Sequence, residues 1–134
     1  MKTYYITVKN LSYNQDKLLY LRNFNLDPII VKGINGNNKY EYIDSYEYKN
    51  YVSDRYKTFG PNGAIGCFLS HIKVWKRFIC DNSIDDKIMV LEDDIILEDD
   101  FNEKLPEMYI WMTLNQIQAF IQFNNYFNIT LISM

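Results

Sequence analysis

The segment that most constrains the fold of this chain is Ile88–Asp94, with the sequence IMVLEDD. Its four apolar residues in a row are typical of a strand that is buried on both faces, as in a parallel sheet. Three acidic residues follow at once, and open α/β sheets bind their ligands at the carboxyl ends of strands. A divalent cation would offset the repulsion between these carboxylates. The segment therefore favours an α/β fold whose acidic turn is either a metal site or simply solvated.

The first third of the chain indicates a strand, a helix and a second strand in that order. The alternating residues Tyr4–Val8 predict the first strand, Leu11–Phe24 an amphipathic helix, and Ile29–Val31 a second buried strand. Asp27 and Pro28 separate the helix from the second strand, because the residue before a proline avoids helical geometry. Short connections of this kind predict a parallel sheet flanked by helices.

The strongest helical pattern begins at Pro61 and ends before Asp81. Its apolar residues recur with helical spacing, and they are Ile65, Phe68, Leu69, Ile72, Trp75, Phe78 and Ile79. Gly66 within this helix suggests a close approach to another backbone, and Cys67 is expected in the core. The tyrosine-rich residues 39–58 show no period, so we expect either a polar excursion packed by tyrosine rings or a loop that faces an acceptor.

Composition excludes several classes of protein. The chain has 134 residues and a net charge of −3, which favours one domain and no nucleic-acid partner. No apolar run approaches the roughly 20 residues of a transmembrane helix, and the first residues lack the apolar core of a signal peptide. We therefore expect a cytoplasmic protein in which Cys67 and Cys80 are free thiols. Heavy use of Tyr, Phe, Ile, Asn and Lys suggests an AT-rich genome, such as that of a bacterium or a large virus.

Residues 105–134 differ in character from the rest of the chain. Glu107 is their only charged residue, although Asp, Glu, Lys and Arg make up 23% of the chain. This low-charge C-terminal tail is expected to be either a buried strand and helix or sequence that drifted after an early stop or a frameshift.

Two linked motifs carry a resemblance to a known family. The segment Phe59–Trp75, FGPNGAIGCFLSHIKVW, resembles the G-C-x-x-S-H-x-x-x-W region of glycosyltransferase family 25, and Leu91–Asp94 matches the L-E-D-D that follows it there. The loop Gly33–Gly36 lies where that family has an A-x-D-G turn. The resemblance covers about residues 3–104. The family includes bacterial lipooligosaccharide galactosyltransferases and procollagen galactosyltransferases.

The resemblance implies a GT-A fold, a Rossmann-like and mostly parallel sheet, of which residues 1–104 would be the nucleotide-sugar-binding part. It implies transfer of a hexose, galactose or glucose, from a UDP-sugar to a glycan or hydroxylysine acceptor, with inversion and with Mn²⁺ as the cofactor. Asp94 and Asp93 would be the metal ligands. The residues expected on the nucleotide-sugar side are Glu92, Asp93, Ser70, His71 and Asn35. No catalytic base is identified, since Glu98, Asp99 and Asp100 are better explained as solvated charge.

Departures from the family pattern keep a second interpretation open. Gly60 and Gly63 replace the family's capping Thr and Glu, Asn35 replaces an Asp, and Asp16-Lys17 stands where the family has D-R-R. Because the chain looks truncated after its acidic motif, the alternative is a non-catalytic remnant that binds a nucleotide-sugar or a divalent metal without transfer. His71 is expected either as an ordinary helix-face residue or as a support for the site through a hydrogen bond to the acidic loop.

Overall fold

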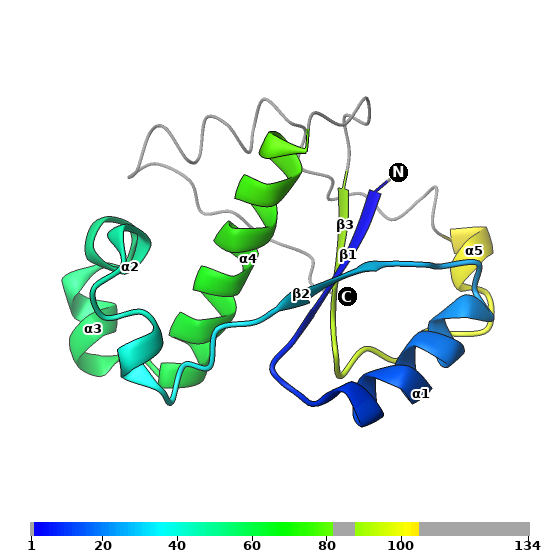
Figure 1. Cartoon of the computed structure of the whole chain (residues 1–134), viewed down its shortest axis with the longest axis horizontal. Coiled ribbons are helices and arrows are strands. Elements are labelled where there is room, and N and C mark those ends of the chain that lie inside the picture. The colour runs from blue at the N-terminus through cyan, green and yellow to red at the C-terminus, as the bar shows by residue number, and fades with distance from the viewer. Residues whose placement is uncertain (1, 82–87, 105–134) are drawn as a thin grey trace.

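The computed structural model describes residues 2–81 and 88–104, which form a three-stranded sheet between helices (Figure 1). The strands are β1 (Lys2–Thr7), β2 (Ile29–Lys32) and β3 (Ile88–Glu92). Their order is β2-β1-β3, and both pairings are parallel. The predicted α/β fold with a parallel sheet is confirmed. The expected tail, residues 105–134, lies outside the described residues.

Helices connect and cover the strands. They are α1 (Leu11–Arg22), the 3-10 turn η1 (Lys39–Glu41), α2 (Tyr46–Tyr51), α3 (Asp54–Phe59), α4 (Asn62–Cys80) and α5 (Phe101–Lys104). The helix α1 ends earlier than the expected Phe24, because Asn25 adopts a left-handed backbone with φ of 58°. Pro61 is the residue just before α4, where its missing N–H costs nothing.

The tyrosine-rich middle segment is more ordered than its sequence indicated. It folds into η1, α2 and α3, and the side chains of Ser45 and Ser53 cap α2 and α3 by accepting from the backbone N–H of Tyr48 and Tyr56. Tyrosine rings also pack within it, since the ring centroids of Tyr42 and Tyr48 lie 5.1 Å apart. The expected packing by tyrosine rings is confirmed, whereas its two short helices were missed.

The sheet separates two cores. Tyr4 and Ile6 of β1 point into the core under α4, and Tyr5 between them points into the core under α1 and α5. Figure 1 shows α4 on one side of the sheet and α1 with α5 on the other. The same alternation runs along β3, where Val90 faces α4 and Leu91 faces α1. Residues at the end of β3 therefore alternate between the two sides as well.

The connections create a switch point beside β1. From β1 the chain passes through α1 to β2 at one side of β1, and later through α4 to β3 at the other side. Ligands of open α/β sheets bind at such a point, beyond the carboxyl ends of the strands. The register pairs Ile6 with Glu92, so the residues after β1 meet the acidic residues after β3. No helix within residues 2–81 and 88–104 is long and apolar enough to cross a membrane.

Candidate functional site

A pocket of about 220 Å³ lies at this switch point. Its walls come from the carboxyl ends of β1, β2 and β3 and from the first turns of α4. The structure brings all the residues expected on the nucleotide-sugar side to this pocket, and these are Asn35, Ser70, His71, Glu92 and Asp93. They come from three separate segments of the chain. Asn35, Glu92 and Asp93 meet because the strand ends of a parallel sheet lie at one edge, and α4 brings Ser70 and His71 to the same place.

Glu92 is held from α4. The Nε2 atom of His71 lies 2.9 Å from Glu92 Oε1, and the Cys67 thiol donates to the same oxygen at 3.2 Å. His71 is 2% exposed, and its Nδ1 atom has no partner within residues 2–81 and 88–104. We therefore assign the ring proton to Nε2, which donates it to Glu92. The expected hydrogen bond between His71 and the acidic loop is present.

Cys67 departs from its expected place in the core. It is exposed, and it lines the pocket one helical turn before His71. Partial burial and the neighbouring Glu92 carboxylate raise the pKa of the thiol to about 12. The thiol is therefore protonated at neutral pH and is not a nucleophile.

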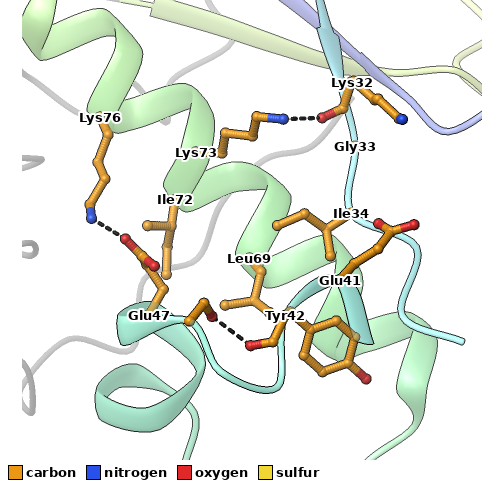
Figure 2. Close-up of a pocket in the computed structure, with 11 residues that line it drawn as sticks. Lys32, Gly33, Ile34, Glu41, Tyr42, Glu47, Leu69, Ile72, Lys73 and Lys76 are labelled. Atoms are coloured by element: carbon orange, nitrogen blue, oxygen red, sulfur yellow. Dashed lines mark hydrogen bonds and ion pairs between the residues drawn. The ribbon is translucent and has the colours of Figure 1, made fainter. Parts of the chain in front are cut away.

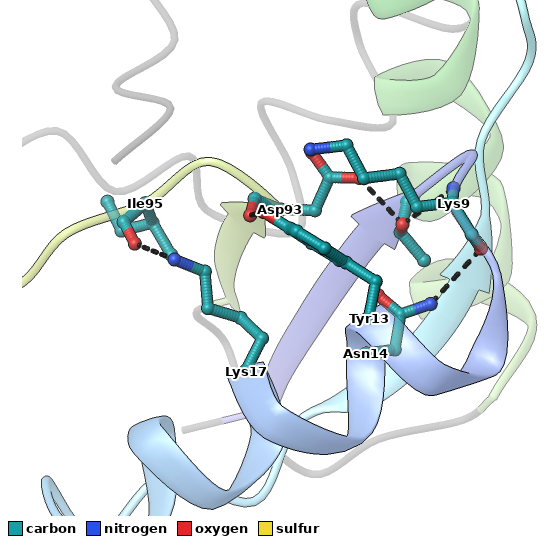
Figure 3. Close-up of polar contacts among 7 residues, drawn as sticks. Lys9, Tyr13, Asn14, Lys17, Asp93 and Ile95 are labelled. Atoms are coloured by element: carbon teal, nitrogen blue, oxygen red, sulfur yellow. Dashed lines mark hydrogen bonds and ion pairs between the residues drawn. The ribbon is translucent and has the colours of Figure 1, made fainter.

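Asp93 is held from the opposite side, by β1 and α1. Thr7 Oγ1 donates to Asp93 Oδ2 at 2.6 Å, and Lys9 Nζ lies 3.7 Å from Oδ1. The Tyr13 hydroxyl donates to the main-chain oxygen of Asp93 at 2.8 Å, as Figure 3 shows. These contacts fix both the side chain and the backbone of Asp93.

The helix α1 also holds the chain that follows the acidic residues. Lys17 Nζ donates to the Ile95 oxygen at 2.6 Å (Figure 3), and the Tyr20 hydroxyl donates to the Leu97 oxygen and accepts from the Leu97 N–H. Tyr13, Lys17 and Tyr20 are three to four residues apart and so share one helix face. Sequence reasoning missed this role of Lys17, although that spacing could have indicated it.

Asp94 is exposed and does not line the pocket. Within residues 2–81 and 88–104 its carboxylate has neither a hydrogen bond nor an ion pair. It is thus the acidic residue of this loop whose oxygens remain available to an external cation.

Ser70 and Asn35 shape the pocket wall. The Ser70 hydroxyl donates to the Gly66 oxygen at 2.7 Å and accepts from the Ile34 N–H at 2.8 Å, which ties the loop after β2 to α4. The Asn35 side chain accepts from the Asn37 N–H at 3.0 Å within that loop. An added Cβ on Gly66 would lie 2.5 Å from the backbone nitrogen of Gly36. The predicted close approach of Gly66 to another backbone is confirmed.

A second and larger pocket, of about 510 Å³, lies between the loop after β2, α2 and α4 (Figure 2). Sequence reasoning did not find it. Two of its three lysines are engaged by the protein, since Lys73 Nζ donates to the Lys32 main-chain oxygen at 2.8 Å and Lys76 pairs with Glu47. The Lys76 ammonium lowers the pKa of the Glu47 carboxyl. This pocket contains none of the expected site residues, so the smaller pocket at the strand ends is the better candidate.

Comparison with known proteins settles the family. The model described as glycosyltransferase family 25 (LPS biosynthesis protein) matches residues 6–130. The chain belongs to glycosyltransferase family 25. The expectation from the two linked motifs is thereby confirmed.

Two kinds of curated relative match this family 25 chain. A procollagen lysyl hydroxylase and glycosyltransferase of Acanthamoeba polyphaga mimivirus is 31% identical over 116 residues, which covers 77% of this chain and 13% of that protein. Procollagen galactosyltransferase 2 of Mus musculus is 48% identical over 46 residues, or 34% of this chain and 7% of the relative. The chain therefore spans only a small part of these relatives. No solved structure matches it.

Proposed function

We propose that this family 25 glycosyltransferase binds a UDP-hexose, with galactose or glucose as the sugar, at the switch-point pocket. The hexose would pass to a glycan or hydroxylysine acceptor with inversion. The observation that carries the proposal is the convergence of Glu92, Asp93 and His71 on one pocket at the carboxyl ends of β1 and β3. The names of the relatives, procollagen galactosyltransferase among them, favour galactose and a collagen-like acceptor.

The pocket size suits the diphosphate end of the donor. Whole-ligand pockets usually have about 300–1,000 Å³, and this one has about 220 Å³. The loop after β2 would border the nucleotide through Asn35, whereas Ser70 positions that loop from α4. Ser70 is therefore a positioning residue in this proposal.

The acidic loop fits a divalent cation. Within residues 2–81 and 88–104 the Asp94 carboxylate has no hydrogen bond or ion pair, whereas Thr7 donates to Asp93 Oδ2 and Lys9 Nζ lies 3.7 Å from Asp93 Oδ1. Carboxylate oxygens are the ligands that Mn²⁺ and Mg²⁺ prefer. We propose Asp93 and Asp94 as the ligands of Mn²⁺, which when bound would offset the negative charge of the departing UDP.

A specific observation favours the second candidate function, donor binding without transfer by this chain alone. The carboxylates that line the pocket within the described residues are Glu92 and Asp93, and the protein already holds both. A transferase of this kind needs a base for the acceptor hydroxyl. Under this second interpretation, the catalytic base and the acceptor site are supplied by residues other than those that line this pocket.

Calorimetric titration with UDP, with and without Mn²⁺, tests the proposal. We expect Mn²⁺-dependent binding that is lost in Asp94→Ala and kept in Asp99→Ala, which removes an exposed acid outside the pocket. Equal loss in both variants, or no binding by the folded wild-type chain, would contradict the donor site. If UDP binds, release of UDP from UDP-galactose in the presence of an acceptor separates transfer from binding alone.

A further inference from the structure

Cys67, His71 and Glu92 form a cluster of three different donor groups. The Cys67 sulfur, the His71 Nε2 atom and a Glu92 carboxylate oxygen all lie within 4.8 Å of one another. Cys67 and His71 are four residues apart on α4, so their side chains project from the same helix face. Glu92 reaches them from the end of β3, on the side of the sheet that faces α4.

The dimensions of the cluster suit a single ion. Zinc binds sulfur at about 2.3 Å, imidazole nitrogen at about 2.0–2.1 Å and carboxylate oxygen at about 2.0–2.2 Å. Two such ligands are therefore at most about 4.5 Å apart. Glu92 Oε1 is already 2.9 Å from His71 Nε2 and 3.2 Å from Cys67 Sγ. The three atoms lie within 4.8 Å of one another, so the side chains must draw closer together when they bind one ion.

We propose that Cys67, His71 and Glu92 form a second cation site, which takes a thiophilic divalent ion such as Zn²⁺ or Co²⁺. Thiolate and imidazole ligands select these ions over Mn²⁺ and Mg²⁺, which prefer oxygen. The ion replaces the two hydrogen bonds to Glu92, and the proton of the Cys67 thiol passes to solvent on binding.

This site differs from the proposed oxygen-only site at Asp93 and Asp94. Glu92, the last residue of β3, meets α4, whereas Asp93 in the turn that follows meets Thr7 of β1 and Tyr13 of α1. The inference does not require that the chain binds UDP. Three protein ligands also leave one coordination position open, as in zinc sites that bind water or substrate, and all three residues line the switch-point pocket.

The buried His71 imidazole weakens the affinity of this site for the ion. When Nε2 binds the ion, the ring proton must sit on Nδ1, which is buried and has no partner within residues 2–81 and 88–104. Metal-binding histidines usually donate that proton to a neighbouring group. Loss of that hydrogen-bond partner weakens the affinity for the metal about 10–100-fold. We therefore expect weaker binding than at a structural zinc site, with complete removal of the ion by EDTA.

Titration of the reduced full chain with Co²⁺ tests the site, because a cobalt–thiolate bond absorbs in the near ultraviolet and oxygen ligands give no such band. We expect the band in the wild type and in Cys80→Ser, which removes the chain's other thiol from outside the cluster. Cys67→Ser should lose the band, and His71→Ala should weaken binding by more than about tenfold. Zn²⁺ should abolish the band and excess Mn²⁺ should leave it.

The proposal would be overturned if the band were absent in the wild type, survived in Cys67→Ser or were lost in Cys80→Ser. Circular dichroism shows whether Cys67→Ser is folded, and that substitution changes one atom of an exposed residue. The variant Asp94→Ala should keep the band even where it loses Mn²⁺-dependent UDP binding. The two proposed sites can therefore fail independently.

Discussion

At the scale of single residues, the contact between Gly66 and Gly36 sets how closely the loop after β2 approaches α4. An added Cβ at position 66 would lie 2.5 Å from the Gly36 nitrogen and 2.6 Å from the Ile34 oxygen, both backbone atoms. Gly63 lies three residues earlier in α4 and would meet nothing within 4 Å. The two glycines therefore form a matched pair for one experiment.

We expect Gly66→Ala to lower the free energy of unfolding by about 1–3 kcal/mol, because backbone must move to admit the methyl group. Gly63→Ala should raise it by roughly 0.5–1 kcal/mol, since alanine favours a helix over glycine. Urea denaturation of both variants measures these changes. Equal effects of the two substitutions would contradict the close contact.

The second prediction at this scale concerns how stability depends on pH, and it rests on two neighbouring tyrosines of β1. Burial and the hydrogen bond to Asp81 raise the pKa of Tyr4 to about 12, and burial together with Asp93 raises the pKa of Tyr5 further still. A raised tyrosine pKa means that the fold favours the neutral phenol. This stabilisation is complete below the ordinary value of about 10 and is lost as pH rises through 10 to 12.

We therefore expect the free energy of unfolding to fall above pH 10, and Tyr5→Phe to make that fall shallower. The Tyr5 hydroxyl is buried with no partner in the described part of the chain, so Tyr5→Phe should be neutral or stabilising by up to about 1 kcal/mol at pH 7. Tyr4→Phe should destabilise, because it removes the hydrogen bond to Asp81. Urea titrations at pH 7, 10 and 11 distinguish these outcomes.

At the scale of elements, α1 acts as a clamp on residues 93–97. Its side chains at positions 13, 17 and 20 bond the main chain of Asp93, Ile95 and Leu97 in turn. The Tyr20 hydroxyl makes two of these bonds, so it is the most informative group to remove.

We expect Tyr20→Phe to speed hydrogen exchange at the Leu97 amide, which loses its acceptor, and to weaken Mn²⁺-dependent UDP binding. The expected loss of stability is about 1–3 kcal/mol, since buried backbone groups are left unsatisfied. Tyr40→Phe is the control, because Tyr40 is 95% exposed. Unchanged exchange at Leu97 would show that α1 does not hold the loop.

The elements also show where sequence reasoning works and where it fails. The three strands and α4 were predictable, because the length of buried runs such as Ile88–Leu91 is typical of a strand and the apolar stripe of α4 has helical spacing. The helices α2 and α3 have no apolar stripe, and their only local signals were the capping residues Ser45 and Ser53. The spacing of Tyr13, Lys17 and Tyr20 indicates a shared helix face, but their partners are backbone groups of residues 93–97, which no side-chain pattern in that segment reveals.

At the scale of the whole molecule, the candidate site was predictable as a group but not in its internal bonds. A parallel sheet brings the ends of β1, β2 and β3 to one edge, which accounts for the meeting of Asn35, Glu92 and Asp93. The partner of each carboxylate depends on the register between β1 and β3, which no local pattern in the sequence encodes. The second pocket likewise depends on how α2 packs against α4.

If UDP and Mn²⁺ bind at this edge, they should stabilise the entire fold. A ligand at 100 times its Kd that binds only the native state adds about 2.7 kcal/mol to the free energy of unfolding. We expect a gain of that size in urea denaturation with both ligands, and a much smaller gain in Asp94→Ala. A gain that persists in that variant would place the ligands elsewhere.

The central position of β1 has a consequence for how the chain is made. Thr7 and Asp93, which share a hydrogen bond in the finished site, are 86 residues apart. At about 5–20 residues per second, a ribosome adds that length in roughly 4–17 seconds. Throughout that interval the nascent β1 exposes one unpaired edge and apolar side chains that attract chaperones or neighbouring chains. The site of this protein therefore forms only when β3 docks beside a strand that emerged first.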